Sequence, residues 1–316
     1  MFRGIVFVIT ACFIWGLIFV IPSFVENFSA IELAIARCFS FGILALAFLV
    51  LRKRYLFRET PREVWKAAFI FTFLANVIHY FTLVLGLRYA NAGVMTLIIG
   101  TAPVCIAIFG NFQNKEFSFK PLIIPCFLLL IGLTLVNLGP LLWTENSSSL
   151  EDYLLGLVFG VISLFSWVWV AAKNSQFLKK FPNLKITDWV TVLGITTLCW
   201  SVLSIVGLLS LIATDEHLQR YFEPTEELGW FILGAIILGW GCSWIGSYLW
   251  NSASKTLPVA LLGQLCIFET IFALIFLAIL EMRLPDWLEL VGIGVVLVGI
   301  ASNVFVMRNL CKATDA

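Results

Sequence analysis

Long apolar runs separated by short polar segments follow one another along the whole chain. A helix of about 20 mostly apolar residues is long enough to span a bilayer, and ten stretches reach that length. They cover residues 4–25, 31–51, 65–87, 92–112, 121–142, 153–173, 188–212, 229–250, 257–279 and 287–307. The pattern predicts an all-α integral membrane protein with ten transmembrane helices, and it leaves little chain for a soluble domain.

Composition strengthens this prediction. Hydrophobic residues make up 61% of the chain and charged residues 12%, with a mean hydropathy of +1.00, whereas soluble domains usually carry about 25% charged residues. Most of the 8 cysteines fall inside the expected spans, where they act as small hydrophobic side chains rather than as disulfides or metal ligands. We therefore expect no metal site and no cofactor, and the net charge of +1 gives no indication of nucleic-acid binding.

Basic residues are distributed unevenly between the two ends of the expected helices. Lys and Arg concentrate in cytoplasmic loops of membrane proteins. If the N-terminus is cytoplasmic, most of the 20 basic residues fall inside, and the exceptions are Arg37, Arg88, Arg220 and Arg283. Ten spans with both termini in the cytoplasm are therefore predicted, because a miscounted helix would scramble this segregation.

Weak internal similarity divides the chain into two parts. "ITACFIWGLIFV" in the first span aligns with "ISLFSWVWVAAK" in the sixth and matches Trp15 with Trp167, while Tyr80 in the third span matches Tyr248 in the eighth. Five is an odd number of spans, so the second copy must run in the opposite sense, as in many secondary transporters. We expect two inverted five-helix repeats, residues 1–142 and 153–316, with an outer linker over residues 143–152 and a solute site between the halves near the midplane.

The chain also resembles the drug/metabolite transporter superfamily of the EamA type along nearly its whole length. The resemblance rests on "CFIWGLIFVIP", "LAIARCFSFG", "GVMTLIIGTAPV", "FSWVWVAAKNSQFL" and "LPVALLGQLCIFETIFALI", in that order. The resemblance implies a bacterial inner-membrane carrier. Many members of the family export amino acids, related metabolites or drugs. The family often has a proline where this chain has Thr270. The resemblance therefore does not establish whether the ninth span is kinked there, whereas Pro103 is present in the fourth span.

Charged groups well inside a span are expensive in hydrocarbon and usually face the bundle interior. Two stand out here, Arg37 and Glu269. Their expected depths below the outer edge, roughly 9 and 15 Å at 1.5 Å per residue, lie within reach of each other through the long arginine side chain. They form either a central site that binds solute or a proton, or a buried pair that locks two helices together.

Other polar side chains lie at comparable depth. His79 could relay protons near neutral pH or serve only as an interhelical hydrogen-bond partner. Asn76 lies one turn before His79 and is expected to share its face, and Gln264 and Glu269 loosely share another. Several aromatic residues also lie inside spans and could line a pocket for an apolar or aromatic solute, although packing against lipid would explain them equally well. They are Trp15, Tyr80, Trp167, Trp169, Trp244 and Tyr248.

These features favour a secondary-active transporter, and in view of the resemblance an exporter, that moves a small metabolite such as an amino acid or drug-like solute by alternating access. Protons are a candidate coupling ion, the lipid bilayer is the other partner, and the oligomeric state is open. A channel or facilitator is the alternative, but pores are commonly lined by rings of polar groups. A membrane-embedded enzyme would need clustered catalytic groups, and the only histidines are His79 and His217.

Overall fold

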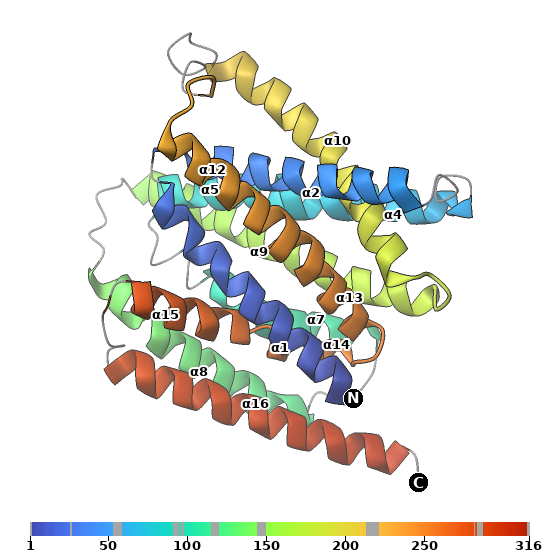
Figure 1. Ribbon diagram of the computed structural model, residues 1–316. Helices are drawn as coiled ribbons and strands as arrows, with labels where there is room; N and C mark the ends of the chain where they lie inside the picture. The colour runs from blue at the N-terminus through green and yellow to red at the C-terminus, as the bar shows by residue number, and fades with distance from the viewer. Residues whose placement is uncertain are drawn as a thin grey trace.

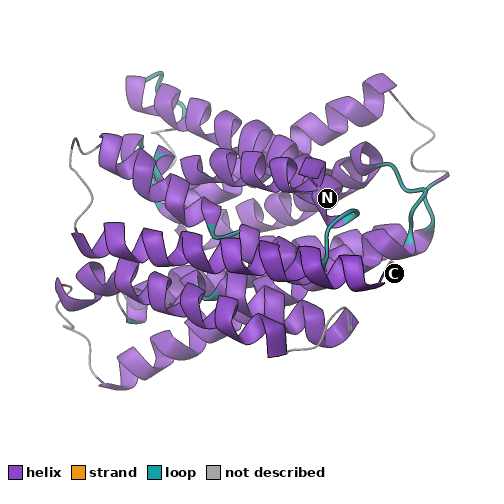
Figure 2. Ribbon diagram, turned by 90° about the horizontal axis from the view of Figure 1, so that it is seen from below, coloured by secondary structure: helices purple, strands orange, loops and turns teal. Residues whose placement is uncertain are grey.

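A computed structural model describes residues 2–25, 27–52, 59–90, 95, 98–114, 120–143, 150–212, 221–280, 282 and 287–314. All regular structure in these ranges is helical (Figures 1 and 2). The described part of the chain is therefore all-helical, as its apolar pattern predicts.

Seven helical segments are long and apolar enough to cross a membrane. They cover Phe2–Phe24, Ala30–Leu51, Arg62–Tyr89, Leu150–Lys180, Ile186–Gly207, Glu226–Ser254 and Val259–Leu280. These segments match seven of the ten expected spans. The other three expected spans overlap α7 (Ala102–Asn114), α8 (Lys120–Trp143) and α16 (Trp287–Thr314), which are not among these seven segments, so ten spans remain a prediction.

The first two spans are simple in outline. The first consists of α1 (Phe2–Gly16) continued by the short 3-10 turns η1 (Leu17–Phe19) and η2 (Ile21–Phe24), and the second is α2 (Ala30–Arg52). A capping box starts α2: the Ser29 amide donates to Glu32 Oε2 at 2.7 Å, and the Glu32 amide donates to Ser29 Oγ at 3.3 Å. This reciprocal pair satisfies amide groups at the start of a helix that would otherwise lack partners.

Two spans share an unusual internal organisation. In the third, α4 (Arg62–Thr72) passes into the π-helix η3 (Phe73–Ile78) and then α5 (His79–Tyr89). In the eighth, α12 (Glu226–Ile236) passes into the π-helix η4 (Ile237–Ile245) and then α13 (Gly246–Ser254). The π-helix follows 11 α-helical residues in both cases. Because wider turns shift the register of the next helical segment, they re-aim its side chains, and they occur frequently at functional sites.

The fourth and ninth spans are each interrupted. A turn at Thr101 precedes α7, two residues before Pro103. The ninth span consists of α14 (Val259–Leu265) and α15 (Phe268–Leu280), separated by a turn at Cys266 and Ile267. The ninth span is therefore broken without a proline at Thr270, and Glu269 lies in the first turn of its second half.

The helices pack in groups that mix the two expected repeats. In one group, which we call the first bundle, α1 packs against α13 and α15, and α2 packs against α12 and η4. In the second bundle, α9 (Leu150–Lys180) packs against α5 and α7, and α10 (Ile186–Ile212) packs against α4. The main contacts between the bundles are α2 with α10 and α7 with α14, while α8 and α16 pair beside them (Figure 1).

Small residues allow the closest of these approaches. A Cβ atom on Gly42 of α2 would lie 2.4 Å from Leu198 Cβ of α10. A Cβ atom on Gly239 of η4 would lie 2.8 Å from the carbonyl oxygen of Arg37. The second contact brings the π-helix of the eighth span directly against the backbone of α2 beside its charged residue.

Candidate solute site between two helix bundles

Arg37 lies on α2, in the first bundle, and its side chain is partly buried. Its Nε atom is buried and has no hydrogen-bond partner. The guanidinium is within electrostatic range of Tyr80 and His79 on α5, in the second bundle, and of Glu269 on α15. A cation at the boundary between the bundles thus retains a donor that no protein group uses.

Glu269 lies in the first turn of α15, where a helix N-terminus favours negative charge. Its Oε2 atom lies 3.8 Å from Cys266 Sγ, the donor in a weak hydrogen bond. No ion pair or hydrogen bond joins Glu269 to Arg37 in the described part of the chain, so the two charges act on each other only at longer range. The locked pair considered from sequence is absent in this conformation.

His79 is held by α9. Its Nδ1 atom lies 3.0 Å from the Ser163 carbonyl oxygen and 2.8 Å from the Ser163 hydroxyl, and that hydroxyl also lies 2.8 Å from the carbonyl oxygen of His79. The His79 ring packs on Trp167, with centroids 5.6 Å apart. These contacts fit the interhelical hydrogen-bond interpretation of His79, and they fix its ring close to Arg37.

Asn76 does not share the surroundings of His79, which corrects the expectation from spacing. Asn76 lies in the π-helix η3, and its Nδ2 atom donates to Thr197 Oγ1 of α10 at 3.2 Å. Tyr80, the next residue after His79, instead donates its hydroxyl to the Ala30 carbonyl oxygen at 3.0 Å. The wider π-helical turns account for the difference, because they change the direction of residues relative to a regular α-helix.

Gln264 is likewise separated from Glu269. Its side chain is 0% exposed, and its Nε2 atom lies 3.6 Å from Cys126 Sγ of α8, away from the charged residues. Its Oε1 atom is buried without a partner. The break at Cys266 and Ile267 ends the regular spacing that would have aligned the two residues, so the shared face expected in the ninth span is wrong.

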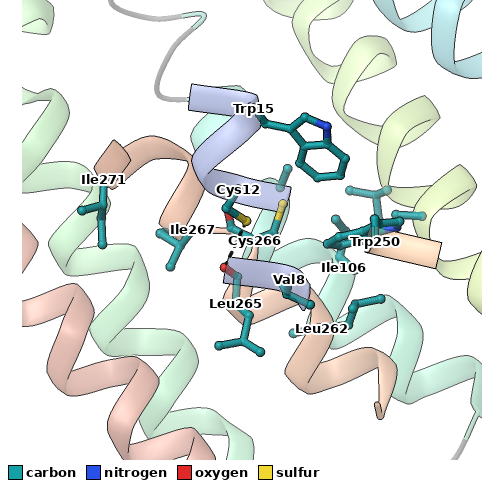
Figure 3. Packing of buried hydrophobic residues seen from close by; sticks show 14 of the residues in the cluster. Val8, Cys12, Trp15, Ile106, Trp250, Leu262, Leu265, Cys266, Ile267 and Ile271 are labelled. Atoms are coloured by element: carbon teal, nitrogen blue, oxygen red, sulfur yellow. Dashed lines mark hydrogen bonds between the residues drawn. The ribbon is translucent and has the colours of Figure 1, made fainter. Parts of the chain in front are cut away.

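Around the charged residues, aromatic side chains occupy the first bundle. Trp15 donates its Nε1–H to the Cys242 carbonyl oxygen at 2.8 Å. Its ring packs against Trp250, with centroids 5.4 Å apart, and Figure 3 shows both side chains in the buried cluster. The Trp244 ring stacks on Phe48, with ring centroids 4.7 Å apart, and on Tyr248, with ring centroids 6.2 Å apart. Its Nε1 atom is buried with no partner. The Trp15 indole is thus occupied by contacts between helices, whereas the Trp244 Nε1–H has no hydrogen-bond acceptor.

Trp169 lies apart from this site. It packs edge-on against Phe71, with ring centroids 5.9 Å apart, beside a buried apolar cluster formed mainly by α4, α9 and α10, with Leu49 of α2. Its contacts are therefore those of ordinary packing inside the second bundle.

Two sets of buried polar residues were not singled out from the sequence. Glu32 is only 6% exposed and accepts a short hydrogen bond from the Tyr221 hydroxyl, and the motif Ser29-x-x-Glu32 could have indicated its capping role. Asn174 donates to Asn251 Oδ1 at 2.7 Å. No sequence signal pairs those two asparagines, since they lie on different helices.

Comparison with known proteins agrees with the membrane architecture. Residues 2–138 match the EamA-like transporter family. Inner membrane protein YtfF of Escherichia coli (strain K12) is 30% identical over 305 residues, which cover 95% of this chain and 94% of that protein. The chain belongs to the EamA-like transporter family. An uncharacterized transporter of Archaeoglobus fulgidus is 25% identical over 235 residues, covering 72% of this chain and 79% of that protein.

A solved crystal structure shares the fold of this EamA-like transporter. The two superpose with a TM-score of 0.75 at 18% sequence identity, over 97% of this chain and 98% of the other. This EamA-like transporter therefore shares its fold with the other protein over nearly all of both chains.

Proposed function

We propose that this EamA-like transporter is a secondary-active carrier that exports a small metabolite by alternating access, with the solute bound between the two bundles. The observation that carries the proposal is Arg37, a partly buried cation with an unused Nε donor at the bundle boundary. A charge inside a membrane protein commonly marks a solute or ion pathway. The unused Trp244 Nε1 donor, from the same bundle, supports the same interpretation.

Two inverted repeats of five helices, residues 1–142 and 153–316, are part of this proposal. The third span of each repeat has the same α–π–α order. The packing also keeps its pattern when the repeats are exchanged, because α1 packs on α13 as α9 packs on α5, and α2 packs on α12 as α10 packs on α4. The family match over residues 2–138 covers the first of the two repeats.

The proposed division of labour between the charged groups follows from their positions. Arg37 and Glu269 both belong to the first bundle, while His79 and Tyr80 belong to the second. A solute bound between the bundles would therefore meet a cation and a carboxylate on one side and an imidazole and a phenol on the other. Glu269 is also the proposed proton-coupling group, since its carboxylate has no charged partner in contact.

The proposed orientation places both termini in the cytoplasm of a bacterial cell, with the protein in the inner membrane. Figure 1 shows both termini toward the same end of the bundle. The excess of Lys and Arg expected at that end supports a cytoplasmic location for it, and the similar protein from Escherichia coli is an inner membrane protein.

A two-step experiment tests this function. Purified protein is first screened by thermal shift against amino acids, nucleosides, sugars and aromatic drugs. Each stabilising compound is then tested in radiolabelled form for counterflow in proteoliposomes. A carrier accelerates uptake when unlabelled compound is present on the opposite side, whereas uptake independent of the opposite side would indicate a channel and contradict the proposal.

A further inference from the structure

The contacts that hold the two bundles together differ at the two ends of the molecule. This comparison rests on the proposed function, because it concerns the surfaces that alternating access would have to separate. At the end that carries the termini, α13 of the first bundle packs against α9 and α10 of the second. The equivalent surfaces at the other end are those of α5 against α1 and α2, and the packing of α2 against α5 there is slight.

A buried polar network joins the bundles at the end that carries the termini. Asn174 Nδ2 donates to Asn251 Oδ1 at 2.7 Å, and Asn174 Oδ1 accepts from Trp189 Nε1 at 3.0 Å. Asn251 Nδ2 donates to the Ser247 carbonyl oxygen, also at 2.7 Å. Both carboxamides are buried, so separating the helices would break these hydrogen bonds and expose the polar groups to water.

Two further contacts extend the network along the same boundary. Ser175 Oγ donates to the Ser254 carbonyl oxygen at 3.2 Å. Lys255, which follows α13, donates to the carbonyl oxygens of Pro182, at 3.0 Å, and Leu184. Partial burial lowers the pKa of Lys255 relative to an exposed lysine. The bridge therefore runs from α9 through the following loop to the end of the eighth span.

At the other end, the residues equivalent to Asn174 and Asn251 are not carboxamides. There, the Tyr80 hydroxyl donates to the Ala30 carbonyl oxygen across the boundary at 3.0 Å, and this hydrogen bond is exposed. The alignment that matches Trp15 with Trp167 and Tyr80 with Tyr248 places Pro22 opposite Asn174 and Leu83 opposite Asn251. Neither a proline nor a leucine side chain can form a hydrogen bond like that between the two asparagines. The sequence itself therefore accounts for this difference between the two ends.

We propose that the contact between Asn174 and Asn251, with Ser175–Ser254 and Lys255, is the inner gate of the carrier. In this conformation the gate is closed, and the pathway opens to the cytoplasm only when these bonds break. Buried hydrogen bonds suit this task, because their protein partners can be replaced by water when the gate opens. The same bonds would hold the bundles together permanently if they were only structural, and the two roles predict different behaviour.

Cysteine labelling at a buried position beside the gate distinguishes a gate from a purely structural network. This measurement needs no transported compound. Ser254 is fully buried at the boundary, so Ser254→Cys serves as a reporter in a background with Cys199 and Cys311 replaced by serine. Asn174→Ala should raise the rate of maleimide labelling at Ser254→Cys about tenfold, the effect expected for losing a buried hydrogen bond. The same background without Ser254→Cys measures labelling of the remaining cysteines.

Thr72→Val is the matched control. It removes the 3.1 Å hydrogen bond between the hydroxyls of Thr72 and Thr196, which is also buried but lies within the second bundle. The gate predicts an unchanged labelling rate for this variant. Equal acceleration by both substitutions, in proportion to lost thermal stability, would overturn the gate and leave a structural network. If Asn174→Ala does not fold, Asn251→Ser replaces it, because serine keeps a polar group at the boundary.

A crosslink provides the second arm. Asn183 and Thr256 are exposed near the gate on opposite bundles. Joining Asn183→Cys to Thr256→Cys with a short reducible bis-thiosulfonate should stop counterflow of a compound found by the screen, and reduction should restore it. Counterflow that continues through the crosslink would overturn the gate. If the screen finds no compound that shows counterflow, the proposed function is contradicted. The labelling of Ser254→Cys would still show whether the gate exists.

Discussion

At the scale of single residues, two charged side chains, Arg37 and Glu269, lie at or near the boundary between the bundles. Arg37 faces a boundary where its Nε atom finds no protein partner, and Glu269 lies within its electrostatic range without touching it. An arrangement of this kind leaves both groups available to a solute or proton. A tightly bonded pair would instead have satisfied both groups in the resting protein.

Glu269→Gln tests the role of the carboxylate. The substitution keeps shape and most hydrogen-bonding capacity but removes the charge, so the protein should fold and insert while counterflow, or its pH dependence, is largely lost. Counterflow of a compound found by the screen is measured between about pH 5 and 8, the range in which a proton-coupled group would act. Glu63→Gln, the same change at a carboxylate that is 70% exposed, should behave as the parent. An unchanged rate and pH profile for Glu269→Gln would make Glu269 a structural group.

Arg37→Leu tests the contribution of the buried cation to folding. Removing it leaves Glu269 without a compensating charge in an apolar region, and uncompensated buried charges are strongly destabilising. The folded yield after detergent extraction should fall more than for Arg88→Leu, which alters an exposed arginine. Arg37→Lys should recover much of the yield because it keeps the positive charge. Similar yields for Arg37→Leu and Arg88→Leu would show that the cation does not stabilise this region.

At the scale of the elements, interruptions of regular helix determine where side chains point. The π-helices η3 and η4 and the turn at Cys266 and Ile267 all occur in spans that contribute to the boundary between the bundles. They separate Asn76 from His79 and Gln264 from Glu269. Close packing of η4 on α2 then holds the region around Arg37 in place.

Gly239→Ala tests this packing. The added methyl group would meet the Arg37 carbonyl oxygen at 2.8 Å and the Phe41 amide nitrogen at 2.9 Å, and backbone atoms cannot move aside as a flexible side chain can. Overpacking of this kind typically costs about 1–3 kcal/mol, so the thermal unfolding midpoint should fall. Gly229→Ala adds the same group where nothing lies within 4 Å, and its midpoint should not fall. A midpoint for Gly239→Ala no lower than that of Gly229→Ala would contradict the tight contact.

Glu32→Ala tests the anchor at the start of α2. The carboxylate accepts from the Ser29 amide and hydroxyl, both at 2.7 Å, and from the Tyr221 hydroxyl before α12. Loss of the cap alone, as in Ser29→Ala, costs about 1 kcal/mol, and Glu32→Ala should lower the thermal midpoint further because the link to Tyr221 is lost too. Glu227→Ala, in the exposed first turn of α12, is the control. A smaller effect for Glu32→Ala than for Ser29→Ala would show that Tyr221 adds no stability.

At the scale of the whole molecule, topology decides which bundle surface faces which compartment. We expect both termini in the cytoplasm and the segment over residues 214–228 outside, part of which, including Arg220, lies beyond the described residues. Glu223 is exposed in that segment, so Glu223→Cys in a background without Cys199 and Cys311 should react with a membrane-impermeant maleimide in right-side-out vesicles. Asn183→Cys, at the opposite end, should react only after the membrane is opened. The reverse pattern would invert the proposed orientation.

The amino-acid sequence by itself determined that this protein lies in a lipid bilayer. It also identified the charged residues for which that environment is most costly. Apolar runs of bilayer length and the low share of charge require a helical membrane protein, because backbone polar groups in lipid must be satisfied within each helix. The same constraint makes a charge inside a span conspicuous, which is why Arg37 and Glu269 could be selected without coordinates. Glu32 escaped selection because it lies at the edge of its span, although its capping motif is legible.

Only the tertiary structure decided which of these residues meet. Regular helical spacing predicted shared faces for Asn76 with His79 and for Gln264 with Glu269, but local π-helical turns and a helix break, which apolar periodicity does not encode, rotate them toward different neighbours. The mixing of helices from both halves of the chain within each bundle, and the pairing of Asn174 with Asn251, depend on contacts between residues far apart in the chain. Such contacts arise from the packing of whole helices against one another, so no local stretch of sequence contains them.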